Sequence, residues 1–111
     1  MTLPQKVYLI DTNVILRYLL SDHQTFSPRA EAFFKKVADD EKRAQIPAVV
    51  IMECVYVLEK FYKAPSPEIV DALTQILGLK GIANTDKSEI IRALLCYKDH
   101  GADIVDCLLA A

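Results

Sequence analysis

The chain has 111 residues, a length that suits one small domain with a core of its own. Hydrophobic residues make up 52% of it, with only 3 glycines and 5 prolines, which excludes disordered, collagen-like and low-complexity proteins. The 13 basic and 15 acidic residues give a net charge of −2, so any nucleic-acid function has to rest on a local site rather than on a strong basic field.

Strands and helices alternate in the first half of the sequence. A short β-branched and aromatic run predicts a buried strand, and two segments with apolar residues at helical spacing follow it. Ser27 and Pro28 have the order of an N-cap and a first helical residue. The elements predicted here are a strand at 7–10, a helix at 14–20, a helix from Ser27 to about residue 40, and a short strand around residues 45–46.

Helices dominate the second half. Ser66 and Pro67 repeat the cap-plus-proline signal, and Asp86 with Glu89 three residues later has the form of a capping box. The predicted elements are helices at 49–62, 69–77 and 90–100, a weak strand at 81–84, and a last helix that begins at residue 102 or 103 and runs to Ala111. Strands that alternate with more numerous helices indicate an α/β fold with a small parallel sheet.

The apolar runs are short and the cysteines are few. The run at residues 7–10 is too short for a signal-peptide core, and the run at 48–52 is too short to cross a bilayer. The three cysteines have neither zinc-ligand spacing nor the even number of a disulfide framework. Each lies in an apolar helical pattern that predicts a buried, reduced thiol, namely Cys54, Cys96 and Cys107. We expect a cytoplasmic protein without a membrane partner.

Two acidic residues stand at unusual places. Asp11 directly follows the first predicted strand, and ligands of open α/β sheets bind at the carboxyl ends of strands; capping of the next helix is the ordinary alternative. Glu53 interrupts the most apolar part of the sequence, residues 49–58, where an unpaired buried charge costs several kcal/mol. A place near a helix N-terminus also suits Glu53, so both interpretations stay open for each residue.

Asp103 and Asp106 are three residues apart and share one face of the last predicted helix. Their mutual repulsion is offset either by the helix N-terminus or by a cation. Together with Asp11 and Glu53 they form a set of oxygen ligands of the kind that suits Mg²⁺ or Mn²⁺. A cation held by carboxylates typically serves phosphate chemistry, although spacing alone does not show that the four groups converge.

Three segments resemble the motifs of the PIN-domain ribonucleases, particularly the VapC-type toxins of toxin–antitoxin pairs. Residues 7–19 are similar to the family's first strand and first acidic motif, residues 46–53 to its second acidic motif, and residues 101–111 to its third. The resemblance extends from Val7 to the end of the sequence. Each motif is short, and their order and spacing together make the resemblance specific.

The resemblance implies a PIN-like three-layer fold and a metal-dependent endoribonuclease that hydrolyses RNA phosphodiesters with Mg²⁺ or Mn²⁺. The residues that it assigns to metal binding and catalysis are Asp11, Glu53, Asp106 and Asp103, the last as a position that holds water or a second ion. It makes Thr12 or Asn13 a supporting residue that orients the first carboxylate or its bound water. It also implies a homodimer and a small antitoxin that occupies the active-site groove.

Family members usually continue into another strand with a Thr-x-Asp-type motif and a further carboxylate, whereas this sequence ends at Ala111. We therefore expect residues 1–111 to form a single PIN-like domain that lacks its C-terminal strand region. The alternative function is a catalytically incomplete PIN-like domain that acts as a protein-binding module. A phosphatase of the haloacid-dehalogenase type is disfavoured, because Asn13 stands where that chemistry needs a second Asp. Scattered basic residues such as Arg17 are more typical of a charged helix face than of RNA contacts.

Overall fold

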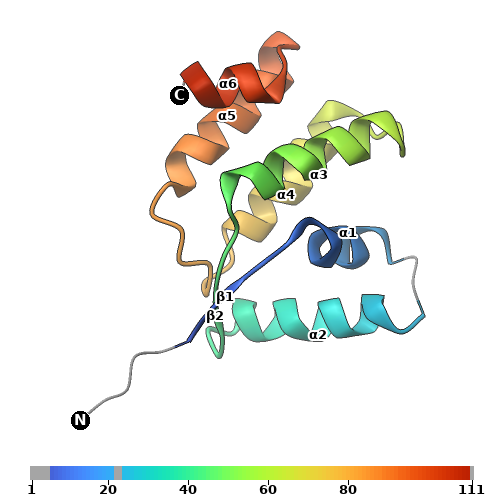
Figure 1. Ribbon diagram of the computed structural model, residues 1–111, viewed down its shortest axis with the longest axis vertical. Helices are drawn as coiled ribbons and strands as arrows, with labels where there is room; N and C mark the ends of the chain where they lie inside the picture. Colours follow the sequence, from blue (N-terminus) through green and yellow to red (C-terminus); the bar gives the residue numbers. More distant parts are fainter. Residues whose placement is uncertain (1–5, 22–23, 111) are drawn as a thin grey trace.

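A computed structural model describes residues 6–21 and 24–110, and within them six helices pack around a small parallel sheet (Figure 1). The elements in chain order are β1 (Val7–Leu9), α1 (Thr12–Leu20), α2 (Phe26–Ala38), β2 (Arg43–Gln45), α3 (Ala48–Lys60), α4 (Ser66–Leu77), α5 (Lys87–His100) and α6 (Ile104–Ala110). The helices α1 and α2 pack as one pair, and α3 to α6 form a second group of neighbouring helices. The α/β fold with a small parallel sheet flanked by helices is therefore confirmed.

The sheet is centred on β2. β1 pairs with β2 in parallel, and on the other side Ala44 of β2 forms a parallel bridge with Ile82. The N–H of Ala44 donates to the carbonyl of Gly81 at 2.9 Å, and the N–H of Ala83 donates to the carbonyl of Ala44 at 2.8 Å. The weak strand predicted at 81–84 is therefore reduced to a single bridge.

Gly81 allows this third segment to pass close to the turn between α2 and β2. A Cβ at this position would lie 2.3 Å from the carbonyl oxygen of Lys42 and 2.6 Å from that of Val37. The Gly81 N–H donates to the same Val37 carbonyl at 2.9 Å. Only a residue without a side chain permits this approach of two backbones.

The core lies between the sheet and the two groups of helices. Each helix from α1 to α5 contributes at least one fully buried apolar side chain, for example Ile15, Phe34, Ile51, Leu73 and Leu94. The helix α3 buries one face at a spacing of three and four residues, formed by Val50, Ile51, Cys54, Val55 and Leu58. No helix in the described part of the chain is both long and apolar enough to cross a membrane.

The prediction that the first strand is buried is wrong. Val7 and Leu9 are 43% and 73% exposed, because β1 is the outer strand of the sheet and its pairing partner is β2. Only Ile10, directly after β1, is buried, and its N–H donates to the carbonyl of Gln45 at 2.9 Å. Apolar β-branched residues are typical of edge and central strands alike, so composition did not separate the two.

Three predicted caps also differ from the structure. The helix α4 begins at Ser66 and its N-cap is Pro65, so Ser66 lies inside the helix instead of capping it. The helix α2 begins at Phe26, so Ser27 lies inside the helix and is buried instead of capping it. Asp86 does precede α5, but its side chain accepts a hydrogen bond from Asn84 at 3.0 Å and caps no helical N–H. A side-chain partner only two residues away thus competes successfully with the helix cap. The predicted end of the last helix at Ala111 lies outside the described residues.

Candidate functional site

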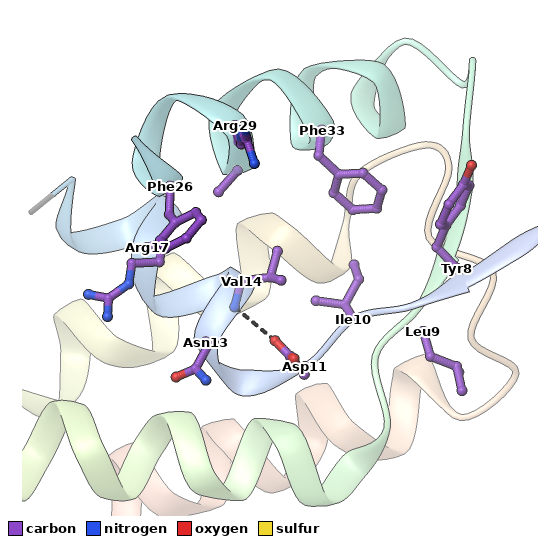
Figure 2. Close-up of a pocket in the computed structure, with 11 residues that line it drawn as sticks. Tyr8, Leu9, Ile10, Asp11, Asn13, Val14, Arg17, Phe26, Arg29 and Phe33 are labelled. Atoms are coloured by element: carbon purple, nitrogen blue, oxygen red, sulfur yellow. Dashed lines mark hydrogen bonds between the residues drawn. The ribbon is translucent and has the colours of Figure 1, made fainter. Parts of the chain in front are cut away.

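Asp11 lies where β1 gives way to α1. Its Oδ1 accepts a hydrogen bond of 3.0 Å from the N–H of Val14, which makes it the N-cap of α1 (Figure 2). Capping, the ordinary alternative for this residue, is therefore observed. A carboxylate has two oxygens and about four acceptor sites, so the cap leaves Asp11 able to bind a further ligand.

A side-chain hydrogen bond joins the start of α1 to α3. The hydroxyl of Thr12 donates to Oε2 of Glu53 at 2.6 Å, across 41 positions of the sequence. This contact brings the carboxylate of α3 next to the residue that follows Asp11. Thr12 thus orients Glu53, whereas the resemblance made Thr12 or Asn13 the residue that orients Asp11 or its bound water.

Glu53 is exposed, so the prediction that it is surrounded by the core is wrong. Its sequence neighbours Met52 and Cys54 are partly or fully buried. Successive residues of a helix point about 100° apart, and the buried face of α3 therefore lies beside Glu53 and not around it. The carboxylate needs no buried cationic partner in this position.

Cys54, a buried residue of α3, lies close to this pair of acids. Burial, and then the negative charges of Glu53 and Asp11, raise the pKa of the Cys54 thiol to about 12. Both carboxylates act on the same fully buried thiol, so they share one electrostatic neighbourhood. A site of this kind favours a cation and keeps Cys54 protonated at neutral pH.

The other two predicted acids lie at the start of α6. Gly101 ends α5 in the left-handed conformation, with a φ of 65°, and allows the chain to turn toward α6. Oδ1 of Asp103 accepts a hydrogen bond from the N–H of Val105 at 2.8 Å, and Asp106 stands in the first helical turn. Both acids are exposed, and α6 packs on α5 and also contacts α3.

The four predicted carboxylates thus form two local sets, one at the α1–α3 contact and one on α6. Among residues 6–21 and 24–110, no three or more His, Cys, Asp or Glu side chains are grouped closely enough to bind one metal ion. The donor chemistry of Asp11 and Glu53, two carboxylates of which one is held by the Val14 N–H and the other by the Thr12 hydroxyl, fits a hard cation. The structure therefore brings Asp11 and Glu53 together and leaves Asp103 and Asp106 as a separate set.

A cavity of about 510 Å³ opens beside Asp11, between β1, α1 and α2 (Figure 2). Asn13 lies at its edge, and two basic residues from different helices, Arg17 and Arg29, reach it. Its wall also contains aromatic rings, those of Tyr8, Phe26 and Phe33. No sequence pattern predicts this cavity, because residues on two separate helices show no common spacing; only the packing of α1 on α2 joins them.

Comparisons with known proteins place this chain in a family. Residues 8–111 match the family model described as PIN domain. The chain is also 30% identical over 101 residues to a VapC ribonuclease of Aquifex aeolicus (strain VF5), which covers 90% of this chain and 73% of that protein. No solved structure matches significantly. Since the matched region includes all four acidic positions and nearly the whole chain, the protein belongs to the PIN domain family as a VapC-type member.

Proposed function

We propose that this protein is a metal-dependent endoribonuclease that hydrolyses RNA phosphodiesters and acts as the toxin of a toxin–antitoxin pair. The observation that carries the proposal is the 2.6 Å hydrogen bond from Thr12 to Glu53. It joins the carboxylate of α3 to the segment of Asp11, and these are the first two acidic positions of the motif pattern. The match to a VapC ribonuclease supports RNA as the substrate.

The residues proposed to hold Mg²⁺ or Mn²⁺ are Asp11 and Glu53 of the first set and Asp106 of the second, with Asp103 of the second set as a position for water or a second ion. When bound, such a cation supplies an activated water and stabilises the oxygen that leaves the phosphate. The chain's own groups prepare the ligands for this role. The N–H of Val14 holds one oxygen of Asp11, and the hydroxyl of Thr12 holds one oxygen of Glu53, so each carboxylate presents its other oxygen in a restricted orientation.

The cavity beside Asp11 is the surface that we propose for RNA. The net charge of the chain is −2, so attraction to phosphates has to be local, and Arg17 and Arg29 supply positive charge in the cavity that Asp11 lines. The rings of Phe26 and Phe33 offer surfaces on which a base can stack. Replacing the exposed Arg29 by Ala is expected to raise the KM for RNA several-fold and to weaken its salt dependence.

The proposed partners are a small antitoxin and a second copy of the chain. Binding of an antitoxin over the cavity would block RNA and the acids at the same time. A homodimer has twice the chain mass of 12.5 kDa, which light scattering after gel filtration measures directly. We also propose that the protein acts in the cytoplasm, because the RNA and the antitoxin of this proposal are located there.

Cleavage of RNA by the purified protein tests the central proposal. We expect cleavage with Mg²⁺ or Mn²⁺, none with a chelator, and none by Asp11→Asn or Glu53→Gln. Asp71→Asn serves as the matched control, because Asp71 lies on α4 and its side chain contacts Gln75. If the wild type cuts no RNA, or if the two site variants cut as well as the control, the catalytic proposal is wrong and the protein-binding alternative replaces it.

A further inference from the structure

Two of the three cysteines meet between the last two helices. The thiol of Cys107 on α6 donates a hydrogen bond to the sulfur of Cys96 on α5, with 2.7 Å between the two Sγ atoms. Both residues are free thiols in the structure. A disulfide bond is about 2.05 Å long, so the sulfur atoms need to approach by only about 0.7 Å to be joined. The third cysteine, Cys54, belongs to α3 and lies beside the acids.

The local fold explains why these sulfurs meet. Gly101 takes a left-handed conformation, with a φ of 65°, at the end of α5, which turns the chain back so that α6 packs on α5. The short helix α6 rests on this neighbour through two buried residues, Ile104 and Cys107. Cys107 is 3% exposed and Cys96 is only half-buried. Cys96 is therefore the residue of the pair that lies closer to solvent, and Cys107 is the buried one.

We propose that Cys96 and Cys107 form a reversible intramolecular disulfide that fastens α6 to α5. This modification site does not depend on the proposed nuclease activity. It matters for the same region, because Asp103 directly precedes α6 and Asp106 lies in its first turn, and the oxidised pair restricts where these carboxylates can move.

The oxidant in this proposal is a low-molecular-weight disulfide, for which oxidised glutathione serves as the probe. The thiolate of Cys96 attacks one glutathione sulfur, forms a mixed disulfide and releases one reduced glutathione. The thiolate of Cys107 then attacks the sulfur of Cys96 and releases the second reduced glutathione. Two protein thiols and one oxidised glutathione thus become one protein disulfide and two reduced glutathiones, and excess thiol reverses the reaction.

Peptide mapping tests the pairing directly. Trypsin cleaves after Arg92 and Lys98, which places Cys96 and Cys107 on separate peptides, and after Arg43 and Lys60, which isolates Cys54. After oxidation of the folded protein and alkylation of the remaining thiols, we expect peptides 93–98 and 99–111 to be joined and Cys54 to be alkylated once the protein is denatured. The intact protein should lose the mass of two hydrogen atoms.

Thermal unfolding tests the fastening of α6. The disulfide restricts the unfolded chain, so the oxidised wild type should melt at least about 4 °C above the reduced protein. Cys54→Ala should keep this difference, whereas Cys96→Ser should abolish it. Cys107→Ala tests the buried partner, and it should leave Cys96 as a mixed disulfide with glutathione.

Several outcomes overturn the proposal. A mixed disulfide on Cys96 of the wild type that never resolves shows that Cys107 does not react. A covalent dimer on a non-reducing gel shows that the bond forms between chains. A wild-type disulfide that leaves the melting temperature unchanged shows that α6 is not fastened by it.

Discussion

The two acidic sets of this protein are held in place in different ways. Asp11 and Glu53 belong to elements that are far apart in the sequence, and the Thr12 hydroxyl connects their segments across 41 positions. Asp103 and Asp106 lie within one turn of each other, and the hydrogen bond of Asp103 goes to the N–H of Val105, two residues away. The first set is therefore a product of tertiary packing, and the second is a product of local helix structure.

This difference has a consequence for the site. Moving α1 relative to α3 breaks the Thr12–Glu53 bond, whereas α6 can shift with both of its acids still in register. The helix α6 has 7 residues, and two of them, Ile104 and Cys107, are buried. The position of the first set thus depends on how two helices pack, and that of the second depends on the placement of one short helix.

Removing one charge from each set gives the largest expected effect. Asp11→Asn and Asp106→Asn should each lower RNA cleavage at least about 100-fold, because each removes a proposed ligand of the cation. Asn caps helices as well as Asp does, so the melting temperature of Asp11→Asn should stay close to that of the wild type. Cleavage rates with Mn²⁺ and thermal unfolding measure both quantities. Full activity in Asp106→Asn would exclude the α6 set from the site.

Breaking the long-range hydrogen bond should have an intermediate effect. Thr12→Val removes the donor to Glu53 and should slow cleavage about 10-fold, the equivalent of about 1.4 kcal/mol, because the carboxylate then samples other orientations. Thr12→Ser keeps the hydroxyl and should restore most of the rate. Single-turnover kinetics on one RNA compare the three proteins. If Thr12→Val cleaves at the wild-type rate, the bond does not position Glu53 for catalysis.

Removing the hydrogen bond between Asp103 and the Val105 N–H should lower the stability of α6 more than it lowers the rate of RNA cleavage. Asp103→Ala removes the acceptor for the Val105 N–H and should destabilise the start of α6 by about 1 kcal/mol. Asp103→Asn keeps an acceptor and should lose much less. Amide hydrogen exchange of residues 104–110 reports this difference without an activity assay. Equal exchange in both variants and the wild type would show that the hydrogen bond does not hold the helix.

The hydrogen bond between α3 and α5 should give the smallest effect and the most specific test. The hydroxyl of Tyr97 on α5 donates to Oε2 of Glu59 on α3 at 2.8 Å. Burial and then this hydrogen bond and charge raise the pKa of Tyr97 from 10.0 to about 12. Since the folded state holds the proton more tightly, the resulting stabilisation is complete below about pH 10 and is lost as the pH rises through about 12.

Tyr97→Phe should therefore cost about 1 kcal/mol near neutral pH and should flatten the alkaline loss of stability. Denaturation curves at about pH 9 and about pH 11 measure the free energy of unfolding on both sides of the usual tyrosine pKa. Glu59→Gln is the matched variant from α3, because it removes the charge and keeps an acceptor. If the free energy of unfolding of the wild type falls no more steeply with rising pH than that of Tyr97→Phe, the raised pKa of Tyr97 is not the cause of the alkaline loss.

Much of the architecture was predictable because it depends on neighbours in the sequence. The helices were found from apolar spacing, and the stop at Gly101 was confirmed by its left-handed backbone. Element ends were less predictable. Ser27 looks like a cap but lies inside α2, and Asp86 takes the nearby Asn84 as its partner, because a cap worth only about 1 kcal/mol is easily outweighed by other contacts.

The sequence by itself determined the α/β class, the place of Asp11 after the first strand, and the position of Asp103 and Asp106 at the start of a helix. These features follow from local propensity and helical periodicity. Only the tertiary structure decided that Glu53 is exposed and bound by Thr12, that a cavity opens beside Asp11, and that Cys96 meets Cys107. Each of these joins separate elements, and the packing of whole helices, which no single segment encodes, decides which side chains touch.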